Sequence, residues 1–61
     1  MSDEIFRQIM AIRDTGRVNM FDVLAVQRMA FESGFYELVC FIEEHREAYI
    51  HFILTGEKSL P

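Results

Sequence analysis

The side chains of this chain that could bind a metal ion are two histidines and the groups near them. His45 and His51 are six positions apart, so on a helix they point in different directions and cannot bind one ion together. Glu47 and His51 are four apart, a spacing that two metal ligands can share but that also describes an ordinary surface pair. Cys40 is the only cysteine, too few sulfur ligands for a structural zinc. The surface pair is favoured, and we predict no metal site.

Acid–base or nucleophilic chemistry would need other groups. Glu43, Glu44 and Glu47 could serve as catalytic carboxylates only in a pocket that shifts their pKa values, and so short a chain has little room for one. No Ser or Cys lies in a recognisable nucleophile motif. Cys40 falls at the edge of an apolar helix face, where a small packing residue is expected. We therefore predict no catalytic residue, no cofactor and no enzymatic activity.

Polar side chains also gather in residues 13–19, between two predicted helices. Arg13, Arg17 and the backbone amides that open the second helix could together hold an anion. The segment has no phosphate-loop signature, however, and the carboxylates of Asp14 and Asp22 oppose an anion. Helix capping and solvation of the loop are the favoured interpretation.

Length and composition describe the domain that must position these groups. Sixty-one residues form one domain at most, because a second core could not be built from what remains. Of the chain, 51% is hydrophobic, including six Phe and two Tyr, and one cysteine allows no disulfide within it. Part of this apolar load must lie at the surface, where large apolar patches usually mark an interface. The composition therefore predicts self-association.

The net charge of −4 and the start of the sequence indicate partners and compartment. Phosphate backbones attract clusters of Lys and Arg, so an acidic chain with scattered bases is a poor nucleic-acid binder. Residues 1–4 are acidic and lack the basic and apolar regions of a signal peptide. No apolar run approaches the ~18 residues of a membrane span. We predict no nucleic-acid partner, no membrane partner and a cytoplasmic location.

The first predicted helix covers about residues 3–15. Ile5, Ile9 and Ile12 follow the i, i+4, i+7 spacing of one helix face, and Gly16 is a natural residue to end the helix.

The second predicted helix covers about residues 20–33, with Asn19 as its expected N-cap. Its apolar residues leave almost no purely polar side, which is typical of a helix buried on most sides. Leu24 and Met29 are therefore expected in the core, with this helix at its centre.

The third predicted helix, about residues 35–55, has one broad apolar face that His45 and Arg46 interrupt midway. A continuous helix of this length would span about 30 Å, well beyond the first helix. Either it breaks near His45 into two helices, or its far half reaches a second subunit. The predicted fold is an all-α bundle of three helices forming one domain over residues 1–56, followed by a frayed tail at residues 57–61.

The first two helices are too short to cover the whole apolar face of the third. The uncovered part predicts a protein interface made by Tyr36, Phe41, Tyr49, Phe52 and Ile53. Two copies of the chain, each hiding this surface from water, would form a homodimer.

A helix-turn-helix is a further interpretation of the middle of the chain. Ala30 and Gly34 are spaced as in the core of that motif, which would make residues 36–44 the recognition helix. Such a helix must offer donors to base edges and phosphates. This one offers three carboxylates, so a DNA-binding regulator is the less favoured reading.

Several stretches resemble a known family: IRDTGRVNMFDV at 12–23, GFYELV at 34–39, EEHR at 43–46 and TGE at 55–57. The chain is similar to small uncharacterised proteins of this length from phages, prophages and mobile elements of Gram-positive gut bacteria. The resemblance implies no activity, cofactor or site residues. It implies a small accessory protein of a mobile element, a kind of protein that often acts by binding a host protein.

Together, these features predict a helical protein–protein interaction module that binds itself and an unidentified host or phage protein. The alternative is an acidic inhibitor that imitates nucleic acid and blocks a host defence nuclease or another nucleic-acid enzyme. The two hypotheses differ in salt dependence, because binding driven by carboxylates weakens as ionic strength rises.

Overall fold

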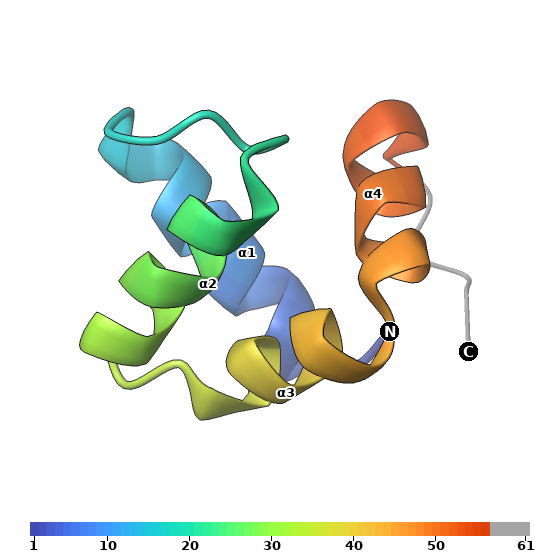
Figure 1. Ribbon diagram of the computed structural model, residues 1–61, viewed down its shortest axis with the longest axis horizontal. Helices are drawn as coiled ribbons and strands as arrows, with labels where there is room; N and C mark the ends of the chain where they lie inside the picture. The colour runs from blue at the N-terminus through green and yellow to red at the C-terminus, as the bar shows by residue number, and fades with distance from the viewer. Residues whose placement is uncertain (57–61) are drawn as a thin grey trace.

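The computed structural model describes residues 1–56, and four helices account for most of them (Figure 1). They are α1 (Asp3–Thr15), α2 (Val23–Glu32), α3 (Tyr36–Glu44) and α4 (Arg46–Thr55). These described residues contain no strand, which confirms the all-α class. These residues form four helices rather than three, because the third predicted segment is broken at His45, which was one of its two predicted alternatives. The predicted tail at residues 57–61 lies outside the described part.

α1 has the bounds that the sequence predicts, because local groups cap both of its ends. The Ser2 side-chain oxygen accepts a hydrogen bond from the backbone N–H of Ile5 at 3.1 Å, satisfying one of the donors left open at a helix start. Gly16 follows the helix with φ 65°, the left-handed conformation that favours glycine. Its N–H donates to the Arg13 carbonyl at 3.1 Å.

α2 begins at Val23, later than predicted, because the two candidate caps have different roles. The Asp22 carboxylate is the N-cap and accepts from the Ala25 N–H at 3.3 Å. The Asn19 side chain instead accepts from the Phe21 N–H at 2.9 Å, which stabilises a turn ahead of the helix. The predicted helix over residues 20–33 is therefore wrong at both ends. α2 begins later than predicted, at Val23, and ends one residue earlier, at Glu32.

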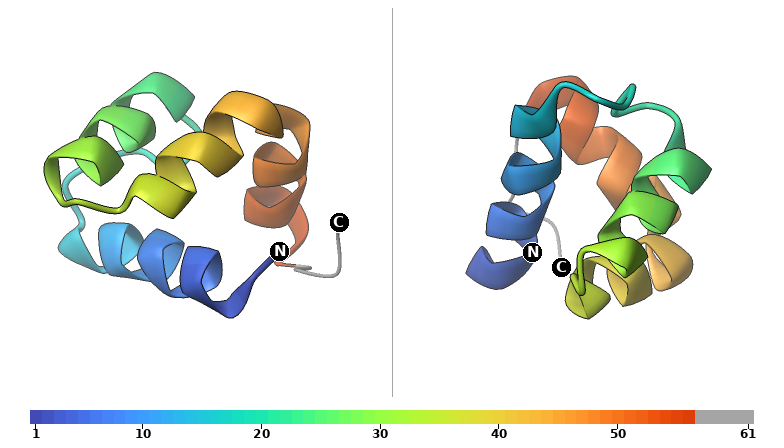
Figure 2. Two further views of the ribbon diagram at one scale, coloured as in Figure 1. Left: turned by 90° about the horizontal axis from the view of Figure 1, so that it is seen from below. Right: turned by 90° about the vertical axis from the view of Figure 1, so that its left-hand side faces the viewer.

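α3 lies at the centre of the fold and packs against each of the other helices (Figure 2). The predicted central position of α2 is wrong, since the side chains of Leu24 and Phe31 are 67% and 61% exposed. α2 turns Val26 and Ala30 into the core, and Met29 is half-buried. The buried apolar core consists of Ile9, Ile12, Val26, Ala30, Leu38, Phe41, Ile42, Tyr49 and Phe52.

A single residue separates α3 from α4. His45 has φ −138° and ψ 51°, outside the helical region, and it serves as the end of α3 and the start of α4. Its N–H donates to the Phe41 carbonyl at 2.7 Å, and its own carbonyl accepts from the Tyr49 N–H at 3.0 Å. Of the two predicted alternatives, the break near His45 is confirmed.

The break lets α4 fold back onto the same chain (Figure 1). The Tyr49 hydroxyl donates to the Met20 carbonyl at 2.7 Å, connecting α4 to the loop before α2. The Phe52 ring meets the Phe6 ring of α1 edge-on, with centroids 5.8 Å apart. The expectation that the far half of the third segment stays uncovered is therefore wrong for Tyr49 and Phe52, which the chain's own α1 and loop cover.

Candidate protein-binding groove

An open groove of about 590 Å³ lies between the start of α1 and the outer side of α3. The base of the groove is apolar. Phe41, only 6% exposed, belongs to the hydrophobic core, and Ile5 packs against that core. Exposed Tyr36 and Cys40 add a ring and a thiol from α3. The residues lining this groove are Met1, Ser2, Ile5, Tyr36, Glu37, Cys40, Phe41, Glu44 and His45.

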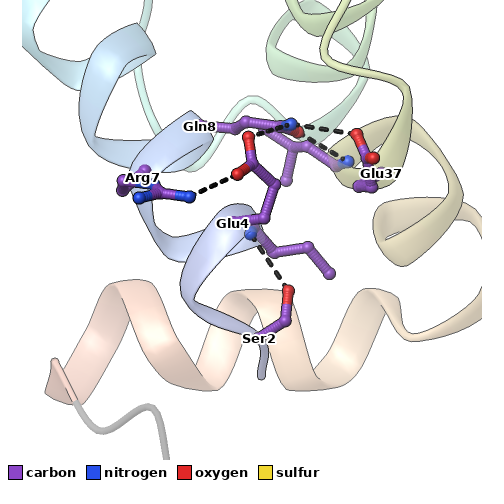
Figure 3. Close-up of polar contacts among 7 residues, drawn as sticks. Ser2, Glu4, Arg7, Gln8 and Glu37 are labelled. Atoms are coloured by element: carbon purple, nitrogen blue, oxygen red, sulfur yellow. Dashed lines mark hydrogen bonds and ion pairs between the residues drawn. The ribbon is translucent and has the colours of Figure 1, made fainter.

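Gln8 fixes the spacing of the two helices that form the groove (Figure 3). It is the buried polar side chain of the described core, at 5% exposure. Its oxygen accepts from the Leu38 N–H at 3.0 Å, in the first turn of α3, where Phe35 provides no side-chain cap. Its amide donates to Glu37 at 3.0 Å and to Glu4 at 3.2 Å. A residue of α1 thus caps α3 and holds the two helices together.

Negative charge lies along the rim of the groove. Glu37 and Glu44 both line it, and none of the described lining residues is Lys or Arg. The hydrogen bond from Gln8, followed by one from the Glu37 backbone amide, lowers the pKa of the Glu37 carboxyl. A lowered pKa keeps this carboxylate ionised at neutral pH. The groove therefore combines an apolar base with an anionic rim.

The groove offers contacts rather than reactive chemistry. Cys40 and His45 both line it, but no hydrogen bond joins them in the part of the chain that the structure describes. A cysteine nucleophile needs a base within hydrogen-bond reach. Nor do three His, Cys, Asp or Glu side chains within residues 1–56 come together as metal ligands would.

The five predicted interface residues do not form one surface in the structure. Tyr36 is exposed and Phe41 is buried, and both line the groove. Tyr49 and Phe52 are buried against their own chain, and Ile53 is half-buried beside the core. Of these five residues, Tyr36 at the start of α3 is therefore the one whose side chain is largely exposed.

Sequence reasoning missed the other side of α3. Glu37, Cys40 and Glu44 follow the spacing i, i+3, i+7, which places them on one face of a helix. The sequence predicts Cys40 as a packing residue at the edge of an apolar helix face, whereas its side chain is exposed. The spacing on α3 could therefore have indicated one side of the groove. The sequence of the first turn of α1, which forms the other side, does not indicate that it lies beside α3.

Comparison with known proteins places the chain in a family. Over residues 1–57 it matches the model of a domain of unknown function, DUF5049. The chain belongs to this family. That membership confirms the expected kinship with a small uncharacterised family. No curated protein and no solved structure matches the chain. Because the description of DUF5049 gives no activity, the groove is interpreted from its own geometry.

Proposed function

We propose that this DUF5049 chain is a protein-interaction module whose groove binds a segment of another protein. The observation that carries the proposal is the apolar base of the groove beneath the carboxylates of Glu37 and Glu44, with no Lys or Arg among the described lining residues. Such a surface is complementary to an apolar side chain flanked by Lys or Arg. Tyr36 gives the contact a large ring, as is common at protein interfaces.

The setting of this function is proposed from the resemblance to proteins of phages and mobile elements. The chain would be a small accessory protein in the cytoplasm of the host cell, acting by binding a host or phage protein and without catalysis or a cofactor. Within residues 1–56, none of the helices has both the length and the hydrophobicity of a membrane-spanning segment.

Binding to nucleic acid is a weaker proposal. α2 and α3 are joined by a short turn at Gly34, whose φ is 78°, as in a helix-turn-helix. Yet Glu37, Glu43 and Glu44 are exposed on α3, and their charge opposes phosphates. The same carboxylates would suit an inhibitor that imitates nucleic acid, which is the alternative to be separated by salt dependence.

The native Cys40 allows a direct test, since it is the only cysteine and lies in the groove. A photo-crosslinker is attached to the Cys40 thiol, and the modified chain is added to host lysate. On illumination it should crosslink to a protein that binds the groove. The matched control moves the thiol to α4 in the double variant Cys40→Ala, Leu54→Cys, because Leu54 is exposed and does not line the groove. Equal labelling from both positions would contradict the proposal.

The labelled protein is then purified and its affinity measured against charge-reversed chains. Glu44→Arg, on the rim, should weaken binding by about tenfold or more, which is about 1.4 kcal/mol. Glu47→Arg, exposed on α4 and outside the groove, should change it less than about twofold. Binding that disappears at high salt, to an enzyme that acts on nucleic acid, would support the mimic instead.

A further inference from the structure

The outer side of α2 is a second apolar surface, which adjoins the groove at Tyr36. Leu24 and Phe31 are both largely exposed, and seven positions place them on the same side of the helix. The surface continues into α3, because the Phe31 and Tyr36 rings meet edge-on with centroids 5.7 Å apart. We call the surface formed by these three residues with Arg28 and Glu32 the α2 face. Exposed apolar surface of this kind usually marks an interface.

The charges on the α2 face balance each other. Arg28 and Glu32 are four positions apart, so they lie on the same side of α2. Arg7–Glu4 and Arg13–Asp14 are ion pairs within α1, whereas no ion pair of the described residues involves Arg28 or Glu32. Both are exposed and available to a partner. The whole chain, by contrast, has a net charge of −4, and the groove is lined by the carboxylates of Glu37 and Glu44 with no Lys or Arg among its described residues.

We propose that the occupant of the α2 face is a second copy of this chain. Two chains of equal net charge repel, and a contact between them is least unfavourable where each presents one positive and one negative group. A face with both signs can satisfy itself when a copy is turned by a two-fold rotation. A basic or acidic partner would instead need one sign to dominate the face.

The two-fold arrangement assigns the contacts. With α2 antiparallel to α2 of the second copy and the axis near Phe31, the two Phe31 rings meet at the centre. Arg28 then faces Glu32 of the second copy, and the reverse pair forms on the other side of the axis. Leu24 faces Tyr36 of the second copy in the same way. Each contact occurs twice, as a self-complementary interface requires.

A contact of standard size between two copies would use a large part of the surface of so small a chain. A standard interface takes on the order of 800 Å² from each partner. That is about a fifth of the 4042 Å² surface of this chain, roughly what one side of a molecule measuring 25 × 19 × 18 Å offers.

The decisive test uses two opposite charge reversals on the α2 face. Arg28→Glu leaves two acids there, and Glu32→Arg leaves two bases, so each variant should dimerise at least about tenfold more weakly than the native chain. Mixed together, they should form a heterodimer, because every facing pair is again of opposite sign. Native mass spectrometry separates this heterodimer from either homodimer, and the double variant Arg28→Glu, Glu32→Arg should regain self-association. Arg46→Glu, exposed on α4, changes the net charge as Arg28→Glu does and should dimerise like the native chain.

Three outcomes would overturn the inference: a native chain that stays at the 7.2 kDa monomer mass at high micromolar concentration, single variants that dimerise normally, or a mixture that does not associate. Circular dichroism confirms that each variant stays helical. The inference and the proposed function can fail separately. Glu44→Arg should leave dimerisation intact, whereas Arg28→Glu should leave groove binding intact. Tyr36, shared by both surfaces, is therefore kept unchanged.

Discussion

α2 and α4 are both ten-residue helices with apolar side chains on most sides. They differ in burial, because α4 buries two of its large apolar side chains and α2 exposes two of its own. α4 turns Tyr49 and Phe52 inward, where a loop carbonyl and a ring of α1 meet them. α2 leaves Leu24 and Phe31 in water. The difference lies in what stands opposite each helix, not in how apolar it is. Apolar groups without an opposite surface in their own chain are the ones left for another chain.

The strongest way to break this comparison is to remove the ring that holds α4. Phe52→Ala should destabilise the fold by ~3–5 kcal/mol, as deletion of a buried ring does. Urea unfolding followed by circular dichroism measures the loss. Leu54→Ala, two positions away but exposed, is the matched control and should cost less than ~0.5 kcal/mol. Equal effects of the two substitutions would show that α4 is not packed on the core.

A smaller effect is expected from the hydroxyl that attaches α4 to the loop. Tyr49→Phe keeps the buried ring and removes only the donor to the Met20 carbonyl. The partly buried carbonyl then loses its partner, at a cost of about 1–2 kcal/mol. The same unfolding experiment measures it. An unchanged stability would mean that water replaces the hydroxyl and that the loop does not depend on α4.

The pH dependence of stability tests the same contact without changing its packing. Burial raises the pKa of Tyr49 from 10.0 to about 12. Above pH 10 the unfolded chain releases this proton while the folded chain retains it, so native stability should fall as pH rises from about 10 to about 12. Below pH 10 the contribution is complete and constant. Tyr49→Phe has no such proton, and its stability should fall less over that window. Parallel curves for the two proteins would place the hydroxyl in water.

The sequence predicts some of this arrangement because the relevant groups are neighbours along the chain. The Ser2 cap and Gly16 define α1 without help from elsewhere. The break at His45 was one of two predicted alternatives, and periodicity could not decide between them. Which of the two alternatives forms depends on Phe6 and Met20, which are far away in sequence and contact α4.

The candidate site was predictable only in part for the same reason. Tyr36 could be proposed from its ring and its place on α3. The groove itself requires the start of α1 beside α3, and that contact depends on Gln8 reaching the Leu38 N–H, 30 positions away in sequence. A glutamine among apolar residues of a helix gives no sign of such a partner.

The smallest effect on the folded monomer, and the sharpest test of the comparison, is expected at Leu24. Its side chain is mostly in water, so Leu24→Ala should change the unfolding free energy of dilute protein by less than ~0.5 kcal/mol. The prediction from periodicity that Leu24 lies in the core is therefore wrong. In the proposed dimer, however, Leu24 is buried against the second copy. Stability of the native chain should therefore rise with protein concentration, because association favours the folded state. Leu24→Ala should flatten that rise, while Phe52→Ala should lower the melting temperature at every concentration. If the native melting temperature does not depend on concentration, the α2 face is not a contact between two copies.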